Sequence, residues 1–427
     1  MSAKKKKRGG TFITGVDIGT SKICVAVAEV TEEGIDLLSL TSCPSDGMRK
    51  GIVSDMEAAT AAIRKALIMA RDESGVAVRE AILSLSGGHI ESSVESASIA
   101  VSGRTVSQED IENVIDAAGN APLPAGKDII HVLPVDFIVD GSMGIKDPLG
   151  MPASRLEARV NIITAASEPL RRMIISCEKS GLQASDFAIQ SIASAESALT
   201  GEEREMGTAL IDIGGGTTDI ALFRDGWLQR SAILNIGGNH FTNDLTVGFG
   251  IPFQEAERIK KQFGDLSGAY GPAEAGDDEI DVVGFHNEVK KISGKMVCEI
   301  LRLRGEELLG LIKQEIGRIE GRDGITGAVF TGGGVLMKSF ERLAETILAM
   351  PVRTGKPDLS PKHIYQSAPS LPFSTGIKEE FSGPEYAAVI GLVLYGVNSM
   401  AETGGPMGGG VFTRMSGFFR NIIGRKR

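Results

Sequence analysis

The chain has 427 residues, which exceeds the usual size of a single hydrophobic core, so we expect two or more domains. Hydrophobic residues make up 42% of the chain, enough to bury sizeable cores. The formal net charge is −10, yet five cations lie within residues 4–8 and five more within residues 414–427, and without these ten cations the body carries −20. An acidic body repels phosphate, so the composition argues against a nucleic-acid-binding protein.

The cysteines and histidines show no metal-binding or disulfide pattern. Four cysteines are widely spaced without a C-x-x-C pair, so we expect reduced thiols that act as small apolar fillers rather than disulfides. The five histidines are scattered, which argues against a zinc site. No apolar run reaches the roughly 18 residues of a membrane span, and no apolar stretch follows the basic N-terminus as in a secretory signal. We therefore expect a cytoplasmic protein.

In chain order, residues 1–10 are expected to form a disordered basic arm. Strands are predicted at residues 12–16, 23–30 and 35–40, then a helix over 55–71 whose apolar residues recur three and four apart, then a buried strand at 81–85. Residues 86–163 interrupt this β-β-β-α-β plan with alternating apolar runs and an S-x-x-D helix start at Ser107. We interpret them as a small inserted α+β domain.

The later elements are mainly helical. A helix is predicted over 168–180, ended by Gly181, and residues 187–199 are predicted to connect two halves as a helix. Residues 237–263 are expected to be mostly helical. A long amphipathic helix is predicted over 287–317, with Val289, Met296 and Leu303 among its inward residues. Residues 386–395 are predicted to form a closing buried helix.

Three glycine-rich turns stand out. Residues 210–223 read L-I-D-I-G-G-G-T-T-D-I-A-L-F, and glycines there allow positive φ and a close approach of backbone N–H groups to phosphate oxygens. Nearby hydroxyls and carboxylates could position a hydrated Mg²⁺. An ordinary glycine-rich hairpin would explain this stretch alone, but D-I-G-T-S-K at residues 17–22 repeats its plan, which indicates two related halves that share one nucleotide. The third turn, V-F-T-G-G-G-V-L-M at 329–337, would let a purine or ribose lie against the backbone.

The order of these turns resembles that of the actin, sugar-kinase and heat-shock chaperone superfamily of ATP-binding folds. Within it, the chain is most similar to the FtsA family of actin-like bacterial cell-division proteins, also at residues 47–55, 131–137, 144–151 and 237–245. The resemblance implies an α/β, actin-like two-half ATPase fold with the inserted domain at 86–163. The first half would comprise residues 11–85 and 164–200, and the second half 201–400, with a smaller lobe at about 237–317.

The resemblance also implies ATP and Mg²⁺ in the cleft between the halves. Asp17 and Asp212 would face the metal through water, and Gln190 sits where relatives often orient the attacking water, although a polar helix-start residue is an equal explanation. Glu257 and Lys260 would border the ribose and adenine, or form a plain surface ion pair. The implied nucleotide-binding residues are Asp17, Gly19, Thr20, Ser21, Lys22, Asp212, Gly214, Gly215, Gly216, Thr217, Thr218, Glu257, Lys260, Gly332, Gly333, Gly334 and Met337.

The tail has its own pattern. Residues 401–410 contain five glycines and a proline and predict a flexible linker. Residues 411–427 predict an amphipathic helix with bulky apolar groups opposite cations, as in helices that lie in a membrane interface. Its predicted membrane-facing residues are Val411, Phe412, Met415, Phe418, Phe419, Ile422 and Ile423, with Arg420 on the polar side. Docking on the protein's own body or on a partner is the alternative.

These features together predict an ATP-binding, actin-like division protein that forms filaments and tethers the FtsZ ring to the cytoplasmic face of the inner membrane. The resemblance implies that the insert serves contacts between molecules. It also implies that the smaller lobe receives the acidic C-terminal tail of FtsZ. Lys295 and Arg304 are the candidate contacts, and a solvated helix face is the alternative for both. Later division proteins and anionic lipids would be further partners, and whether ATP is hydrolysed stays open. The competing hypotheses are a small-molecule kinase of the same fold and a pilus-type actin-like assembly ATPase.

Overall fold

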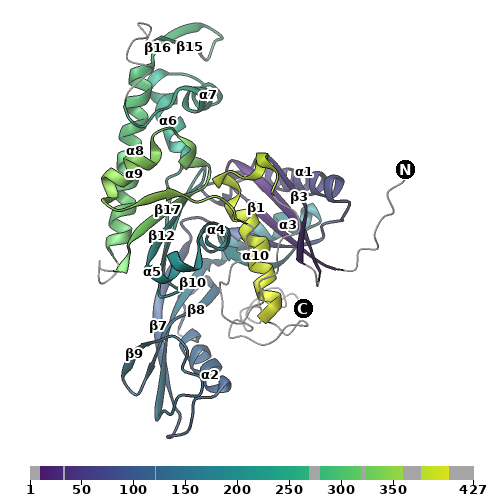
Figure 1. Ribbon diagram of the computed structural model, residues 1–427. Helices are drawn as coiled ribbons and strands as arrows, with labels where there is room; N and C mark the ends of the chain where they lie inside the picture. The colour runs from purple at the N-terminus through teal and green to yellow at the C-terminus, as the bar shows by residue number, and fades with distance from the viewer. Residues whose placement is uncertain are drawn as a thin grey trace.

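The computed structural model describes residues 10–31, 34–120, 122–268, 279–318, 324–358 and 377–402. Its three larger sheets are a five-stranded sheet in each half and a four-stranded sheet in the inserted domain (Figure 1). Residues 1–9 of the predicted arm (1–10), residues 403–410 of the predicted linker (401–410) and the predicted amphipathic helix at 411–427 lie outside the described residues. Among the described residues, no helix combines the length and apolar character that crossing a membrane would require.

The first half follows the predicted β-β-β-α-β plan. β1 (Thr11–Ile18), β2 (Lys22–Thr31) and β3 (Gly34–Pro44) form an antiparallel meander. β6 (Glu80–Leu85) pairs in parallel with β1, and β11 (Gln183–Ile189) pairs in parallel with β6. A short hairpin, β4 (Met48–Arg49) and β5 (Ile52–Val53), precedes α1 (Met56–Ser74). Asp55 caps α1 by accepting hydrogen bonds from two backbone N–H groups, and α3 (Ser167–Ser180) ends at Gly181 as predicted.

The second half repeats this arrangement. β12 (Thr208–Ile213) pairs antiparallel with β13 (Thr218–Arg224) and parallel with β17 (Gly327–Thr331), as β1 pairs with β2 and β6. β14 (Trp227–Leu234) and β18 (Val352–Thr354) complete its sheet. Because the two pairing patterns match, the predicted pair of related halves is confirmed.

The inserted domain has a core of its own. β7 (Ile90–Ala100), β10 (Arg155–Ala166), β8 (Lys127–Val139) and β9 (Ser142–Ile145) form its sheet, and α2 (Gln108–Gly119) packs on it. Ser107 and Asp110 form the capping box that the S-x-x-D pattern predicted. In Figure 1 this domain and the lobe of α6–α9 lie at opposite ends of the molecule.

The smaller lobe corrects one prediction. It contains α6 (Gly238–Phe249), α7 (Phe253–Phe263), α8 (Gly294–Gly317) and α9 (Phe340–Leu348). The helix predicted from residue 287 starts at Gly294, because β16 (Val289–Ser293) pairs with β15 (Glu279–Val283). The inward stripe predicted through Val289, Met296 and Leu303 is wrong, since these side chains are 71%, 52% and 53% exposed. Leu308 and Ile312 are buried, as predicted, and the buried face of α8 also includes Val297 and Leu301.

Two connections between the halves also differ from the prediction. Residues 187–189 finish β11, and the connecting helix α4 (Gln190–Ala198) begins only at Gln190, before α5 (Gly201–Met206). The closing helix α10 (Ala387–Glu402) follows the short 3₁₀ helices η3 (Glu379–Phe381) and η4 (Pro384–Tyr386), and it extends two residues into the predicted linker. A Cβ at Gly391 would lie 1.6 Å from the Ala193 carbonyl oxygen, so α10 packs closely on α4 only because residue 391 is glycine.

Candidate functional site

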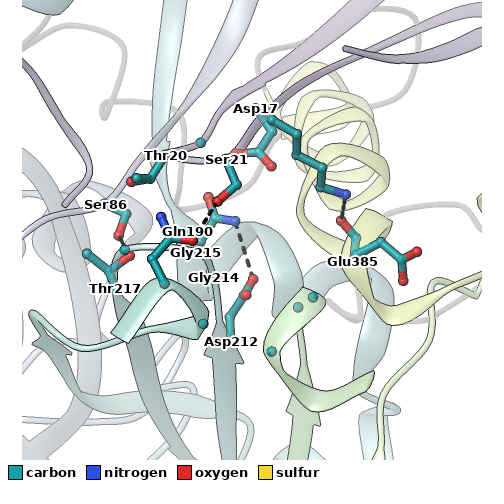
Figure 2. A pocket seen from close by; sticks show the side chains of 18 of the residues that line it. Asp17, Thr20, Ser21, Ser86, Gln190, Asp212, Gly214, Gly215, Thr217 and Glu385 are labelled. Atoms are coloured by element: carbon teal, nitrogen blue, oxygen red, sulfur yellow. Dashed lines mark hydrogen bonds between the residues drawn. The ribbon is translucent and has the colours of Figure 1, made fainter. Parts of the chain in front are cut away.

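A cavity of about 370 Å³ lies where the two halves meet. Its walls come from the turns β1–β2 and β12–β13, from the turn after β17, and from α4, α6, α7 and η4. In Figure 2 the side chains of Asp17 and Asp212 reach it from opposite sides. The three glycine-rich turns predicted to share one ligand are therefore in one place.

The β1–β2 turn is held by its own backbone and by the short hairpin β4–β5. The Gly19 N–H donates to the Lys22 carbonyl oxygen at 3.0 Å, and Thr20 Oγ1 accepts from the Gly51 N–H at 3.1 Å. Ser21 reaches the other half, where its hydroxyl donates to Asn239 Oδ1 at 3.3 Å. All the predicted residues of this turn line the cavity.

The β12–β13 turn needs its glycines for a different reason from the one predicted. None of Gly214, Gly215 and Gly216 has a positive φ. A Cβ at Gly215 would instead lie 2.0 Å from Ser21 Oγ, and one at Gly216 would lie 2.6 Å from Thr20 Oγ1. The two turns therefore approach each other so closely that only glycine fits between them. Gly214 and Gly215 also accept hydrogen bonds from the first N–H groups of α6, which fixes the turn on that helix.

The third turn lies flat against the end of β12. Gly332 has φ 86°, and a Cβ there would lie 2.3 Å from Asp212 Oδ1. The residues that follow form a 3₁₀ helix, η2 (Gly333–Leu336). Gly332, Gly333, Gly334 and Met337 all line the cavity.

Three buried carboxylates face the cavity. Asp17 accepts a hydrogen bond from Ser84 Oγ at 2.7 Å, Asp212 from Ser194 Oγ at 2.5 Å, and Asp219 from Ser86 Oγ at 2.7 Å. Burial raises the pKa of Asp17, raises that of Asp212 to about 6 and raises that of Asp219 well above its usual range. Asp219 Oδ1 is buried and has no hydrogen-bond partner among the described residues. This arrangement suits a cation or a polar ligand in the cavity.

Gln190 fits both descriptions that the sequence allowed. It is the first residue of α4, and its side chain also lines the cavity, where Nε2 donates to Asp212 Oδ2 at 3.3 Å. Its role in orienting water stays a prediction.

Glu257 and Lys260 are not a plain surface pair. Lys260 Nζ lies 2.7 Å from Glu257 Oε2 and donates to Thr242 Oγ1 at 2.9 Å, while the Thr242 hydroxyl donates to Glu257 Oε2 at 2.5 Å. Lys260 is 9% exposed, and burial lowers its pKa although Glu257 opposes that change. Both residues line the cavity.

Some predicted site residues lie elsewhere. Thr218 is fully buried, its hydroxyl donates to the Ile236 carbonyl oxygen at 2.8 Å, and it does not line the cavity, so it belongs to the strand framework. Arg304 on α8 pairs with Asp244 through two nitrogens at 2.6 and 2.9 Å, and Lys295 is exposed on the same helix. The predicted membrane-facing residues are outside the described part of the chain.

The cavity also has residues that the sequence did not point to. Ser84 lies near the end of β6 and Ser86 directly follows it. Because β6 runs parallel beside β1, the Ser84 side chain meets Asp17, and the Ser86 side chain meets Asp219. The S-L-S pattern at the end of a buried strand was a signal that could have located them. Glu385 and Tyr386, far along the chain, also line the cavity.

In the part of the chain that the structure describes, no group of three or more His, Cys, Asp or Glu side chains could hold a metal ion by itself.

Comparisons with known proteins agree with this architecture. A family model described as "Cell division protein FtsA" matches residues 209–391, and one described as "SHS2 domain inserted in FTSA" matches residues 87–164. The cell division protein FtsA of Pseudomonas aeruginosa is 34% identical, covering 92% of this chain and 91% of that protein. The FtsA proteins of Escherichia coli K12 and Bacillus subtilis are 30% and 32% identical, covering 91% and 92% of this chain and 91% and 85% of their own lengths.

Solved structures show the same fold at lower identity. The PilM–PilN type IV pilus biogenesis complex matches with a TM-score of 0.62 and 17% identity, covering 90% of this chain and 98% of that one. MreB5 of Spiroplasma citri bound to ADP matches with a TM-score of 0.51 and 14% identity, covering 90% of this chain and 95% of that one. With the sheets described above, these likenesses confirm the predicted actin-like fold with an inserted domain.

Proposed function

Because the chain belongs to the FtsA family of cell division proteins, we propose that it is an ATP-binding, actin-like protein that links division filaments to the membrane. In this proposal it polymerises, tethers the FtsZ ring to the cytoplasmic face of the bacterial inner membrane and helps to recruit later division proteins. Nucleotide binding is supported chiefly by one observation: the two D-I-G turns, one from each half, line the same cavity.

The residues present fit ATP and Mg²⁺. Gly19, Thr20, Ser21 and Lys22 would face the phosphates from one half, and Gly214–Thr217 from the other, since close, side-chain-free backbone suits phosphate oxygens. Asp17 and Asp212 would hold the metal through water, because carboxylates whose pKa burial has raised gain most from a nearby cation. Bound Mg²⁺ would neutralise phosphate charge. That MreB5 was solved with ADP supports nucleotide binding by this fold.

The adenosine would lie along the third glycine-rich turn. Gly332, Gly333, Gly334 and Met337 offer a flat wall there, and the paired Glu257 and Lys260 would border the ribose. Gln190 is placed to orient water near Asp212, so any hydrolysis would depend on it. Nucleotide that touches both halves would favour the closed, filament-forming arrangement.

The membrane part of the proposal concerns residues 411–427. Deleting them should abolish co-sedimentation of the protein with anionic liposomes while binding of a fluorescent ATP analogue stays unchanged, because the cavity lies in the globular body. The experiment is run with and without ATP, and neutral liposomes are the control. Undiminished sedimentation of the truncated protein would contradict membrane anchoring by the tail and favour the pilus-type alternative.

For FtsZ, the smaller lobe offers two candidate contacts on α8. Lys295 is exposed near the start of the helix, and Arg304 is half-buried and pairs with Asp244. An acidic FtsZ tail peptide should bind several-fold more weakly to Lys295→Glu than to the wild type, and more strongly at low salt. Equal affinity in a fluorescence-anisotropy titration would remove Lys295 from the interface. We also propose the domain boundaries that the sequence predicted. In this proposal the inserted domain serves contacts between molecules.

A further inference from the structure

Lys22 is held by a segment that follows it by more than 360 residues. Its Nζ donates to the Glu385 carbonyl oxygen at 2.6 Å and lies 4.0 Å from the centroid of the Tyr386 ring. In Figure 2 a dashed line marks the hydrogen bond that the Glu385 carbonyl oxygen accepts. Lys22, Glu385 and Tyr386 all line that cavity. The ammonium is therefore fixed on two sides by backbone oxygen and aromatic ring.

The segment that holds Lys22 is itself anchored to the other half. The Pro384 carbonyl oxygen accepts from the Gly332 N–H at 3.1 Å and from Thr331 Oγ1 at 2.8 Å. The Tyr386 ring is packed edge-on against Phe381, with centroids 5.2 Å apart and planes at 87°. These contacts fix the position of η4 and the plane of the Tyr386 ring. They therefore hold one face of that ring against the Lys22 ammonium.

The ammonium acts electrostatically on two carboxylates of the cavity. Asp17 and Asp212 lie close enough for its charge to lower their pKa values, against the larger opposing effect of burial. An ammonium has three N–H donors; the Glu385 carbonyl takes one and the Cys24 thiol is a second neighbour, which leaves at least one donor for another acceptor. A cation over an aromatic face is stabilised by the ring quadrupole without using a donor.

We propose that Tyr386 is a positioning residue of the nucleotide site, which acts by holding the Lys22 ammonium toward the phosphoryl oxygens of the ligand. The proposal rests on nucleotide binding as proposed above. It makes residues 384–386, which lead directly into α10, a necessary part of the site. By linkage, bound nucleotide stabilises the seating of these residues to the same extent as they stabilise the nucleotide.

The test compares ligands with and without phosphate on the full-length protein. Affinities for ATP, ADP and adenosine are measured by calorimetry for the wild type, Tyr386→Leu and Tyr386→Phe. The Leu variant should bind ATP and ADP about 3- to 30-fold more weakly and adenosine equally well, because only the phosphates face Lys22. The Phe variant, which keeps the ring, should restore ATP affinity to within about twofold. Tyr386→Met serves the same comparison if the Leu variant does not fold.

Two controls separate positioning from packing. Tyr395→Leu removes a ring from α10 that contacts His131 and Asp186, and it should leave the ratio of ATP to adenosine affinity unchanged. In a Lys22→Met background, Tyr386→Leu should lower the affinity for ATP no further, because Lys22, through which Tyr386 acts, is absent.

The outcomes that would overturn the inference are distinct from failure of the proposed function. Equal losses for ATP and adenosine, or a full loss that persists in the Lys22→Met background, would mean that Tyr386 only packs the cavity wall. Unchanged ATP affinity in Tyr386→Leu would overturn the inference and leave nucleotide binding intact. A wild-type protein that binds neither ATP nor ADP would overturn the proposed nucleotide site, and this inference with it.

Discussion

Replacing Asp212 by Asn should stabilise the ligand-free protein at neutral pH, because the wild-type carboxylate is then charged at a buried position. Asp212 is 3% exposed, and burial raises its pKa from 3.8 to about 6 even though Ser194 and Gln190 donate hydrogen bonds to it. An amide has the same shape and no charge. The Ser194 hydroxyl can accept a hydrogen bond as well as donate one, so the new amide group finds a partner.

The sign and size of this change in stability follow from the pKa of Asp212 in the folded state and in the unfolded state. A carboxyl group whose pKa is higher in the folded than in the unfolded state costs nothing below the unfolded pKa. Its cost grows as the pH rises toward the folded pKa and is constant above it. A rise of about two units corresponds to about 3 kcal/mol. An imperfect hydrogen bond from the amide would cost about 1 kcal/mol of this, which leaves a net gain of about 2 kcal/mol for Asp212→Asn.

The measurement is the thermal unfolding midpoint of both proteins, without nucleotide, between pH 4 and pH 8. The Asn variant should unfold several degrees higher above about pH 6.5. The difference should shrink through zero between about pH 4 and pH 5, where the amide's imperfect hydrogen bond outweighs the small remaining cost of the charge. Asp281→Asn, which neutralises an exposed carboxylate on β15, is the matched control and should show no such pH-dependent gain. A wild type as stable as Asp212→Asn at pH 7.5, or a difference independent of pH, would refute the assignment of a buried, penalised charge. Affinity for ATP with Mg²⁺ should fall in the same variant, because the charge that destabilises the ligand-free protein is the charge that would bind the metal.

Gly216→Ala should lower ATP affinity at least about tenfold, because its Cβ would lie 2.6 Å from Thr20 Oγ1 and force the halves apart. Gly310→Ala, where a Cβ meets nothing within 4 Å, should bind ATP like the wild type, and equal affinities for both variants would contradict the steric account. Arg204→Met should destabilise the protein by about 3–5 kcal/mol, since it leaves the buried Glu196 carboxylate without its cation. A calorimetric scan of Arg204→Met should show a lower midpoint that a second change, Glu196→Gln, partly restores, and an unchanged midpoint would argue against a structural role for the pair.

The sequence alone determined the features that depend on neighbours along the chain. The two D-I-G turns, the capped starts of α1 and α2 and the glycine that ends α3 were predictable, because capping, turn chemistry and apolar periodicity act within a few residues. The repetition of one turn motif was enough to indicate two related halves, which the matching strand pairings confirm.

Only the tertiary structure decided which distant groups meet. Val289–Ser293 became a strand because β15 offered a partner edge, although its residues continue a helical pattern. The Thr218 hydroxyl donates to a backbone carbonyl oxygen, while the Ser86 hydroxyl of one half donates to the Asp219 carboxylate of the other. The contact of Tyr386 with Lys22 depends on how α10 packs on α4 and on the sheet of the first half. Such contacts follow from the packing of whole elements against each other, and no local pattern of residues encodes that geometry.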